Sequence, residues 1–491
     1  MHNSVDFQPD VPPAAQPTNT PTIFPTTIEP PTGEPTLPPP QISVGNTRTA
    51  TPGATPFETP TNQPPVEHQP DVSYRIAAVF DYAAKHLRVS EHIEISHYPK
   101  DQEQLVLLNE AGLRDQVFNL TSLTVNDQPP ADILQENGTI TFKLFQFLID
   151  PIRVKIEYEL ALPPGPAKLG YTNNQVNFGD WYLAVPPYQT GEGWIVHPPS
   201  LVGEHMLLLP AAFQVRLEII NSPTPLILAA SGAYESTSPN HYEFSINKAR
   251  SFAWSVSAEY ATATRQVGTM TLIAYYLPGY QSAAQAVLEA TANAVSLYTN
   301  QIGSLDLSTL SMVQGEFLDG MEYSGLYFLG QEYYQEYNGS PASYLVPIAV
   351  HETAHQWFYS VVGNDQAMEP WLDESICTYL ELLYFENYLP DLVPWWWQFR
   401  VMRFNPVGWV NSTIYQHSTF RSYVDAVYLR GALWMDHFRT VIGDKLFFYG
   451  LQNYFRQYQN QITTREDFFG VYQDLGISHI DELVEDYFSL P

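Results

Sequence analysis

Residues 349–359 of this chain read AVHETAHQWFY, which places His351 and His355 four positions apart with Glu352 directly after the first histidine. Residues four apart share one face of an α-helix, so these two imidazoles are well placed to bind a single zinc ion. Glu352 lies about 100° around the same helix, where its carboxylate would stand beside the metal's open coordination position. The alternative is a buried helix in which two histidines meet by chance. The spacing predicts a metal site with its own acid–base group.

The flanking residues extend this prediction to a second helix. Pro347 near the start of the segment and Gly363 near its end favour a buried helix between them. A catalytic zinc ion takes three protein ligands and keeps one position open. The downstream run NDQAMEPWLDESICTYLELLYFE predicts another amphipathic helix with Glu374 near its start, and 374 − 355 − 1 = 18 residues separate it from His355. That gap is long enough to end one helix, turn and bring a second alongside, so Glu374 is predicted as the third ligand.

Two more residues of the second helix lie near the predicted third ligand. Glu381 is seven positions after Glu374 and shares its face, where it could accept the free ring N–H of a ligand histidine. The alternative for Glu381 is a solvated helix face. Cys377, the only cysteine, is three positions after Glu374. Because the fourth coordination position of a catalytic zinc must stay open, we predict a buried thiol that packs the helix rather than a fourth ligand.

The first part of the chain differs in composition from the rest. Of the 41 prolines, 18 lie before residue 71, together with 13 threonines, in phrases such as PTNTPTIFPTTIEPPTGEPTLPPP. Proline lacks a backbone donor, and with few apolar residues to bury such a segment is predicted to stay extended and solvated. We therefore predict a disordered tail or linker over residues 1–72, which serves either as a stalk or as a passive tail.

The remaining sequence divides into a strand-rich part and a helix-rich part. From about residue 73, runs such as TITFKLF and IRVKIEYELAL alternate between apolar and polar residues, which predicts an antiparallel β domain over residues 73–266. The run QSAAQAVLEATANAVSLYTNQIG then has helical spacing, two strand-like runs follow, and the chain is mostly helical from residue 344 onward. Residues 267–491 are thus predicted as an α+β, mainly helical domain that holds the metal site.

Charge and apolar content limit the classes of partner and the location. The chain has 22 basic and 52 acidic residues, a formal net charge of −30, which repels nucleic-acid backbones and argues against them as partners. No apolar run is long enough for a transmembrane helix, and the start MHNSVDFQPDVPP lacks the basic and apolar regions of a signal peptide. Because tethers rich in proline and threonine are commonest on exported proteins, we predict an extracytoplasmic location, secreted or surface-tethered, with the export segment absent from this chain. A cytoplasmic protein is the alternative.

The complete pattern resembles a known enzyme family. HETAH, an 18-residue gap and WLDE together resemble the aminopeptidase N-type gluzincins, the zinc metallopeptidase family that includes the alanyl aminopeptidases and leukotriene hydrolase. DGMEYSG resembles the family's G-x-M-E-N motif, and AVYLRGALWMDHFRTVIG resembles the segment around its catalytic tyrosine. The resemblance covers the chain after residue 73. It implies a saddle-like N-terminal β domain, a thermolysin-like catalytic domain and one Zn²⁺ per chain.

The resemblance assigns catalytic roles to the matching positions. It implies that zinc is bound by the two histidines of HETAH and by Glu374. Glu352 would then take a proton from the zinc-bound water and later hand it to the leaving amine. The resemblance selects Tyr428 as the donor to the developing oxyanion, with Tyr423 as the nearest competitor.

The same resemblance implies a site for the free α-amine of the substrate. It places Gly320, Met321 and Glu322 in substrate binding, with Glu322 holding the amine so that only the first peptide bond reaches the zinc. Tyr323 stands where the family has asparagine, and the family's amine-binding element in the β domain has no clean counterpart, with Gln175 as the only candidate. Because the chain stops soon after HIDELVEDYFSLP, we expect that the family's large C-terminal helical domain is missing, a departure that would leave the cleft more open.

The function expected from these residues is zinc-dependent hydrolysis of peptide bonds. The form that the resemblance favours is removal of N-terminal amino acids from peptides with a free N-terminus. One rival is a zinc endopeptidase or oligopeptidase that uses the same site. The other is a non-catalytic surface binding protein that keeps the fold.

Overall fold

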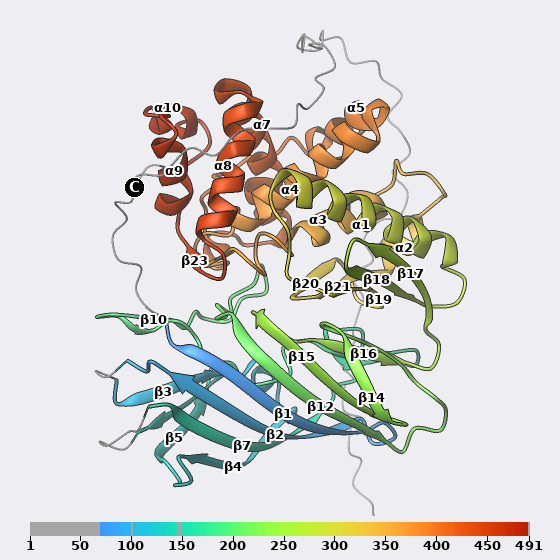
Figure 1. Ribbon diagram of the computed structural model, residues 1–491, viewed down its shortest axis with the longest axis vertical. Helices are drawn as coiled ribbons and strands as arrows, with labels where there is room; N and C mark the ends of the chain where they lie inside the picture. The colour runs from blue at the N-terminus through green and yellow to red at the C-terminus, as the bar shows by residue number, and fades with distance from the viewer. Residues whose placement is uncertain (1–68, 100–101, 145–149, 490–491) are drawn as a thin grey trace, which may run out of the picture. The chain divides into compact units, whose positions relative to one another are not determined.

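The computed structural model of the protein describes residues 69–99, 102–144 and 150–489 (Figure 1). Residues 1–68 of the tail predicted over residues 1–72 lie outside the described residues. Its predicted end was two residues too late, because Asp71 and Val72 already belong to strand β1 (Asp71–Asp81). Pro65–Pro491 form one compact unit, so the division proposed near residue 266 stays a prediction. Among the described residues, no helix is both long and apolar enough to cross a membrane.

The first part of this unit is built on a seven-stranded sheet. Its strands alternate as the sequence pattern predicts, because every second side chain of β1 is buried while those between are exposed or half-buried. Each neighbouring pair is antiparallel except β1 and β12, which are parallel, so the predicted antiparallel β domain is confirmed with one parallel pair. The order across the sheet is β14 (Tyr234–Ser238), β15 (His241–Ala249), β12 (Ala211–Ile220), β1 (Asp71–Asp81), β2 (His86–Ser96), β7 (Ile152–Ala161) and β4 (Phe118–Val125).

Smaller sheets complete the β domain around a shared apolar core. The side chains of Phe178 and Trp254, from two neighbouring strands, stack with ring centroids 3.5 Å apart inside this core. After the short hairpin β10–β11, residues 195–210 form a long connection that carries Glu204. The strands of the smaller sheets are β3 (Gln104–Leu108), β6 (Thr139–Lys143) and β5 (Ala131–Glu136), then β13 (Ile227–Ala230), β16 (Trp254–Ser257), β9 (Val176–Phe178) and β8 (Leu169–Tyr171), with β10 (Tyr188–Gln189) and β11 (Gly193–Trp194) in the hairpin.

A five-stranded sheet opens the second part of the chain. Strands β18, β19 and β21 are parallel, while β17 and β20 are antiparallel edge strands. The order is β17 (Ala261–Val267), β18 (Met270–Tyr276), β19 (Thr309–Gly315), β21 (Leu326–Gly330) and β20 (Gly320–Tyr323). Strand β17 lies almost entirely before residue 267, where the sequence pattern suggested that the second domain begins, yet it pairs with β18.

Helices make up most of the remaining chain, as predicted. Helix α1 matches the predicted alanine-rich helix and contacts both α3 and the sheet strand β18. Helices α3 and α4 contact each other inside a large apolar core, and Figure 1 shows α7 to α10 in orange and red at the C-terminal end. The helical segments are α1 (Gln281–Gln301), α2 (Gln331–Glu336), α3 (Leu345–Ala354), α4 (Trp371–Tyr388), α5 (Val393–Trp395), the π-helical η3 (Trp396–Val401) and η6 (Val424–Leu429), α6 (Phe420–Tyr423), α7 (Arg430–Ile442), α8 (Asp444–Gln457), α9 (Arg465–Asp474) and α10 (Ile480–Val484).

Candidate metal centre

Helix α3 places the two histidines of the opening motif side by side. His351 lies in its last turn, and His355 is the first residue after the helix, with backbone angles (φ −60°, ψ −16°) that are still helical. The amide N–H of His355 donates to the carbonyl of His351, which preserves the four-residue geometry. Both side chains are buried, at 4% and 0% exposure. His351 and His355 therefore lie on one helical face, as their four-residue spacing predicts.

The helix nevertheless ends earlier than its sequence suggests. The prediction of a helix continuing toward Gly363 was wrong beyond His355, because the chain turns and Tyr359 adopts a φ of +131°. The buried guanidinium of Arg250, from the β domain, donates to the Tyr359 carbonyl at 2.6 Å. It also donates to the carbonyls of Leu208 and Gln461 at 2.9 and 2.7 Å. This turn is stabilised by residues that are distant in sequence, which local periodicity cannot reveal.

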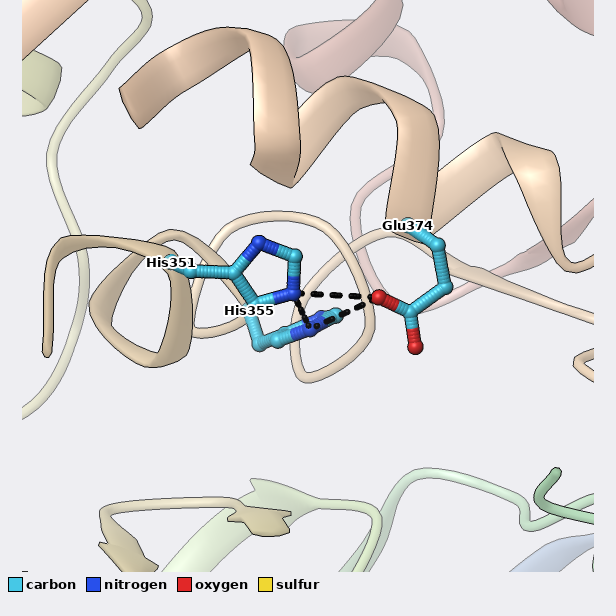
Figure 2. A group of neighbouring side chains, drawn as sticks. All are labelled: His351, His355 and Glu374. Atoms are coloured by element: carbon cyan, nitrogen blue, oxygen red, sulfur yellow. Dashed lines mark hydrogen bonds and ion pairs between the residues drawn. The ribbon is translucent and has the colours of Figure 1, made fainter. Parts of the chain in front are cut away.

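Helix α4 brings the predicted third ligand to the histidines. Glu374 lies in its first turn, and its Oε2 atom is 3.1 Å from His351 Nε2 and 3.4 Å from His355 Nε2 (Figure 2). The two Nε2 atoms are 3.1 Å apart. Zinc binds such ligands at about 2.0–2.1 Å in a tetrahedron, which sets the ligand atoms roughly 3.3–3.4 Å from one another. The triangle observed here fits zinc.

The hydrogen bonds on the far side of each ring explain why this triangle suits a cation. His351 Nδ1 lies 3.1 Å from a Glu381 oxygen, and His355 Nδ1 lies 3.2 Å from the Phe358 carbonyl. Donation at each Nδ1 leaves the Nε2 lone pairs facing the Glu374 carboxylate. Burial by itself would lower the pKa of His351, but its hydrogen bonds with Glu374 and Glu381 raise that pKa to about 9. The cluster therefore attracts positive charge, as protons or as a metal ion.

Glu381 occupies the position predicted for a partner of a ligand histidine, but it is fully buried and not on a solvated face. Besides His351, it binds Arg400 through two hydrogen bonds, of 2.9 and 2.8 Å, and accepts one from the Trp396 indole at 3.0 Å. Burial raises the pKa of Glu381, yet Arg400 and His351 outweigh it and hold that pKa below its usual range. Sequence reasoning missed Arg400 and Trp396, because the π-helical segment that carries them has no metal-site motif.

Glu381→Gln should weaken zinc binding by about 10- to 100-fold, because the amide is a poorer acceptor for His351 Nδ1–H and leaves Arg400 without its counter-charge. The measurement is the zinc dissociation constant, determined by competition with a chromophoric chelator. Glu386→Gln is a matched control, since Glu386 lies on the same helix and pairs with a different arginine, Arg439, at 2.8 Å. Equal zinc affinity in both variants would contradict a supporting role for Glu381.

Glu352 is held beside the metal centre in a confined space. Its side chain is buried, and its Oε2 atom accepts no hydrogen bond from the residues that the structure describes. A Cβ placed on Gly320 would lie 2.0 Å from Glu352 Oε1, so any other residue at this position would force the Glu352 carboxylate to move. Burial raises the pKa of Glu352 to about 8, against the opposing charges of the two histidines. A carboxyl group that titrates near neutrality can both accept and return a proton.

Two tyrosines from the segment α6–η6 face the centre. The ring of Tyr428 stacks on His351 with centroids 5.6 Å apart and planes 13° apart. Burial and then the charge of Glu374, with which Tyr428 also forms a hydrogen bond, raise the pKa of its hydroxyl. Tyr423 is 1% exposed, and its ring is nearly perpendicular to that of Tyr428, with centroids 5.5 Å apart. Because Tyr428 is only partly buried and Tyr423 is enclosed, Tyr428 is the tyrosine that a bound molecule can reach.

The edge strand β20 carries the three residues expected to bind substrate. Gly320 leaves room for Glu352, as described, while the side chain of Met321 packs into an apolar cluster. Glu322 is buried and accepts a hydrogen bond from Gln366 at 2.8 Å. Its carboxylate lies within 4.8 Å of that of Glu374, and Glu204 from the β domain joins the same group. Sequence reasoning missed Glu204, which lies in a connection without a recognisable motif.

Two other sequence candidates have structural partners. Gln175 donates to the Gln314 carbonyl at 3.0 Å and accepts from Asn177 Nδ2 and from the Glu316 amide, at 2.8 and 3.0 Å. The side chain of Gln175 is therefore occupied by these partners, and the β-domain residue that groups with Glu322 and Glu374 is Glu204. Cys377 is fully buried, with its sulfur 3.5 Å from His355 Nδ1, on the side away from the ligand nitrogen.

Comparison with known proteins agrees with this geometry. Residues 306–487 match the peptidase family M1 domain. No curated protein sequence shows significant similarity to the chain. Among solved structures, an M1 zinc metallopeptidase from Deinococcus radiodurans superposes with a TM-score of 0.59 at 17% identity, over 86% of this chain and 95% of that one.

A glutamate-to-alanine mutant of the Deinococcus radiodurans enzyme superposes with a TM-score of 0.59 at 18% identity, over 86% of this chain and 96% of that one. The same mutant bound to a Tyr-Ser-Ala substrate superposes with a TM-score of 0.58 at 17% identity, with the same coverage of both chains. These structures share the fold of the described chain, and the domain match covers both metal-binding helices and Tyr428. Residues 306–487 of this chain thus match a peptidase family M1 domain, and the described chain shares the fold of M1 zinc metallopeptidases, which is consistent with the aminopeptidase N-type gluzincins.

Proposed function

We propose that this protein is an aminopeptidase that removes N-terminal residues from peptides. The observation that carries the proposal is the group of carboxylates beside the metal ligands, in which Glu204, Glu322 and Glu374 lie within 4.8 Å of one another. Burial is the main cause that raises the pKa of Glu204 to about 8, and repulsion by the charges of Glu322 and Glu374 adds to the rise. A positively charged α-ammonium group would relieve that repulsion.

The second oxygen of Glu322 remains available to such a group. Gln366 donates to Oε1, and no other described residue donates to this carboxylate. Gln366 also donates to Asp373 at 2.9 Å, which fixes the amide between two carboxylates and orients Glu322. An ammonium group bound by Glu322 and Glu204 would place the first peptide bond, and no later one, next to the metal ligands.

The proposed mechanism uses residues with separate tasks. Zinc, bound by His351, His355 and Glu374, would polarise a carbonyl and acidify water. Glu352 accepts a proton from the attacking water, whose oxygen bonds to the carbonyl carbon, and returns a proton to the leaving nitrogen as the C–N bond breaks. The Tyr428 hydroxyl donates a hydrogen bond to the carbonyl oxygen, a contact that strengthens as negative charge develops there.

The substrates in this proposal are peptides with a free N-terminus, and one zinc ion serves each chain. A location outside the cytoplasm remains part of the proposal, supported by the composition of residues 1–72. The rival endopeptidase or oligopeptidase would use the same zinc ligands and Glu352, but it would not need an ammonium site. A non-catalytic binding protein would not need Glu352 and Tyr428 beside the metal ligands.

Glu322→Gln tests the proposal, because it removes the charge that would hold the α-amine while keeping a side chain of the same size. For aminoacyl-p-nitroanilides we expect KM to rise by about 30- to 100-fold, the effect of losing one charge-assisted hydrogen bond. Glu316→Gln is the control. Glu316 precedes β20, the strand that carries Glu322, but its carboxylate binds Asn174 at 2.6 Å and Thr172. Cleavage of N-acetylated peptides as fast as free-amine peptides by the unaltered enzyme would favour the endopeptidase instead.

A further inference from the structure

Tyr323, directly after Glu322 in β20, stands where the sequence departs from the G-x-M-E-N motif. The side chains of these two residues point to opposite faces of the strand, because neighbouring residues of a strand alternate. Glu322 lies among the metal ligands, as described above. Tyr323 instead packs in an apolar cluster that includes Ala229 and Ala253 of the β domain. One face of β20 therefore meets the metal centre and the other meets the β domain.

The Tyr323 hydroxyl reaches a carboxylate of the β domain. It donates a hydrogen bond to Asp180 Oδ2 at 3.3 Å, and the two residues are buried, at 1% and 7% exposure. Burial and then the charge of Asp180 raise the pKa of this hydroxyl, so it keeps its proton and acts as the donor. The ammonium group of Lys168 lies 2.8 Å from the same Asp180 oxygen and balances its charge. Lys168, Asp180 and Tyr323 thus form a continuous polar connection from the β domain to β20.

The backbone beside Asp180 leaves a space that fits this hydroxyl. A Cβ placed on Gly179 would lie 2.0 Å from the Tyr323 hydroxyl oxygen, so any other residue there would force the tyrosine to move. The Gly179 amide donates to the Lys168 carbonyl at 2.7 Å, which fixes the backbone at this point. Asp180 has a φ of +50°, a conformation that aspartate adopts more readily than most residues. The residues after β9 therefore form a fitted position for one phenol group.

Strand β20 needs such contacts because it is short and lies at the edge of its sheet. It has four residues and pairs with β21 on one side. An edge strand has a ladder of hydrogen bonds on that side alone, so side chains must fix its other side. The turn after β20 is held at Ser324, whose hydroxyl accepts from the Arg250 amide at 3.0 Å, and Gln356 donates to the Tyr323 carbonyl at 3.0 Å. The Tyr323 hydroxyl adds a hydrogen bond between the strand itself and the β domain.

We propose that Tyr323 is a positioning residue for the substrate amine, because it ties the strand of Glu322 to Asp180 of the β domain. This inference rests on the proposed aminopeptidase function, in which Glu322 and Glu204 hold the α-ammonium group. Glu204 comes from the β domain, so a strand fixed to that domain keeps the two carboxylates in register. A misplacement of about 1 Å can weaken such an oriented site by roughly 100-fold.

The test compares two probes that bind zinc through the same group. L-leucine hydroxamate has a free α-amine, whereas 4-methylpentanohydroxamate lacks only that amine. Calorimetry on the zinc-loaded protein measures both dissociation constants. We expect the unaltered protein to bind the amine probe about 100-fold more tightly, the scale of a charge-assisted contact in a buried site. Tyr323→Phe keeps the ring but removes the hydroxyl, and it should reduce this preference to about tenfold. Affinity for the probe without the amine should change by less than about twofold, because Tyr323 does not contact the zinc ligands.

A second variant tests the connection rather than the tyrosine alone. Asp180→Ala removes the acceptor, so it should also reduce the preference to about tenfold, and the double variant with Tyr323→Phe should lose no more than either single variant. Tyr275→Phe is the matched control. Tyr275 is a buried tyrosine of β18 in the same sheet, its hydroxyl bonds to Ser311, and its variant should keep the full preference.

An undiminished preference in Tyr323→Phe would overturn the inference, and so would an equal loss of affinity for both probes, which marks a merely structural role. Losses that add in the double variant would overturn the connection through Asp180. An unaltered protein that does not distinguish the probes would overturn this inference together with the amine site of the proposed function. Cleavage of aminoacyl-p-nitroanilides is measured in parallel. If they are not cleaved, the aminopeptidase proposal fails, while the two probes still decide the role of Tyr323.

Discussion

Glu352→Gln should lower kcat for a free-amine peptide substrate by about 10³- to 10⁴-fold, at the upper end of what general acid–base catalysis contributes. Glutamine keeps the shape of the side chain in the space left by Gly320, so zinc content should stay at one ion per chain. The amide can neither accept a proton from water nor return one to the leaving amine. The burial that raises the pKa of Glu352 to about 8 is what lets the unaltered carboxyl do both near neutral pH.

The experiment pairs kcat, from initial rates at saturating substrate, with zinc content from elemental analysis. Glu289→Gln, an exposed glutamate on α1, is the control and should retain full activity. A Glu352→Gln protein that holds zinc and keeps more than about a tenth of its activity would show that another group moves the proton. Loss of activity together with loss of zinc would say nothing specific about proton transfer, so both measurements are needed.

Removing zinc should abolish activity and also destabilise the protein. Without a cation, the ligand atoms of His351, His355 and Glu374 remain 3.1–3.4 Å apart in a buried site, where they need protons to compensate. A metal that binds only the folded chain stabilises it by about 4 kcal/mol at a thousand times its dissociation constant. Calorimetry with and without chelator should show a melting temperature lower by several degrees, restored by zinc.

The affinity for zinc should also depend on pH in a defined direction. Because hydrogen bonds raise the pKa of His351 to about 9 in the metal-free protein, this histidine is protonated below that pH and zinc must displace the proton. Zinc affinity should therefore rise with pH between about 6 and 8, by roughly tenfold per unit for each proton displaced. Affinity that is constant over this range would contradict the assignment of His351 as a ligand.

His355→Ala provides the matching variant for these zinc experiments. It removes a ligand from the buried triangle, so added zinc should restore neither activity nor melting temperature. His479→Ala, at an exposed position before α10, is the control and should behave like the unaltered protein. A chelated protein that melts at the same temperature as the zinc-loaded one would show that this triangle does not hold a stabilising ion.

Some of the fold followed from local patterns. Period-two alternation indicates where strands such as β1 lie, because one face of each strand packs against a core while the other does not. Helical spacing likewise identified α1 and α4. The parallel pairing of β1 with β12 was not predictable in this way, since strands far apart in sequence show no sign of their relative direction.

The metal ligands were also accessible to sequence reasoning. The positions of His351 and His355 follow from helix geometry alone, and Glu381 follows from its seven-residue distance to Glu374 on a shared helix face. These spacings depend only on the local helical backbone, so they do not change with the residues that pack around the helix. The length of the 18-residue gap before Glu374 does not by itself fix where that residue lies relative to the histidines. Only the packing of α4 against α3 brings the Glu374 carboxylate to 3.1 Å from His351.

By itself, then, the sequence determined the two-histidine motif, the glutamate beside it and the class of fold, because these depend on periodicity and on residues of one helix. Only the tertiary structure decided the groups that surround them. Glu204 reaches the site from the β domain, Arg400 from a π-helical segment binds Glu381, and Arg250 ends the turn after His355. Each of these contacts joins residues distant in sequence, and chain folding alone sets the distance between them.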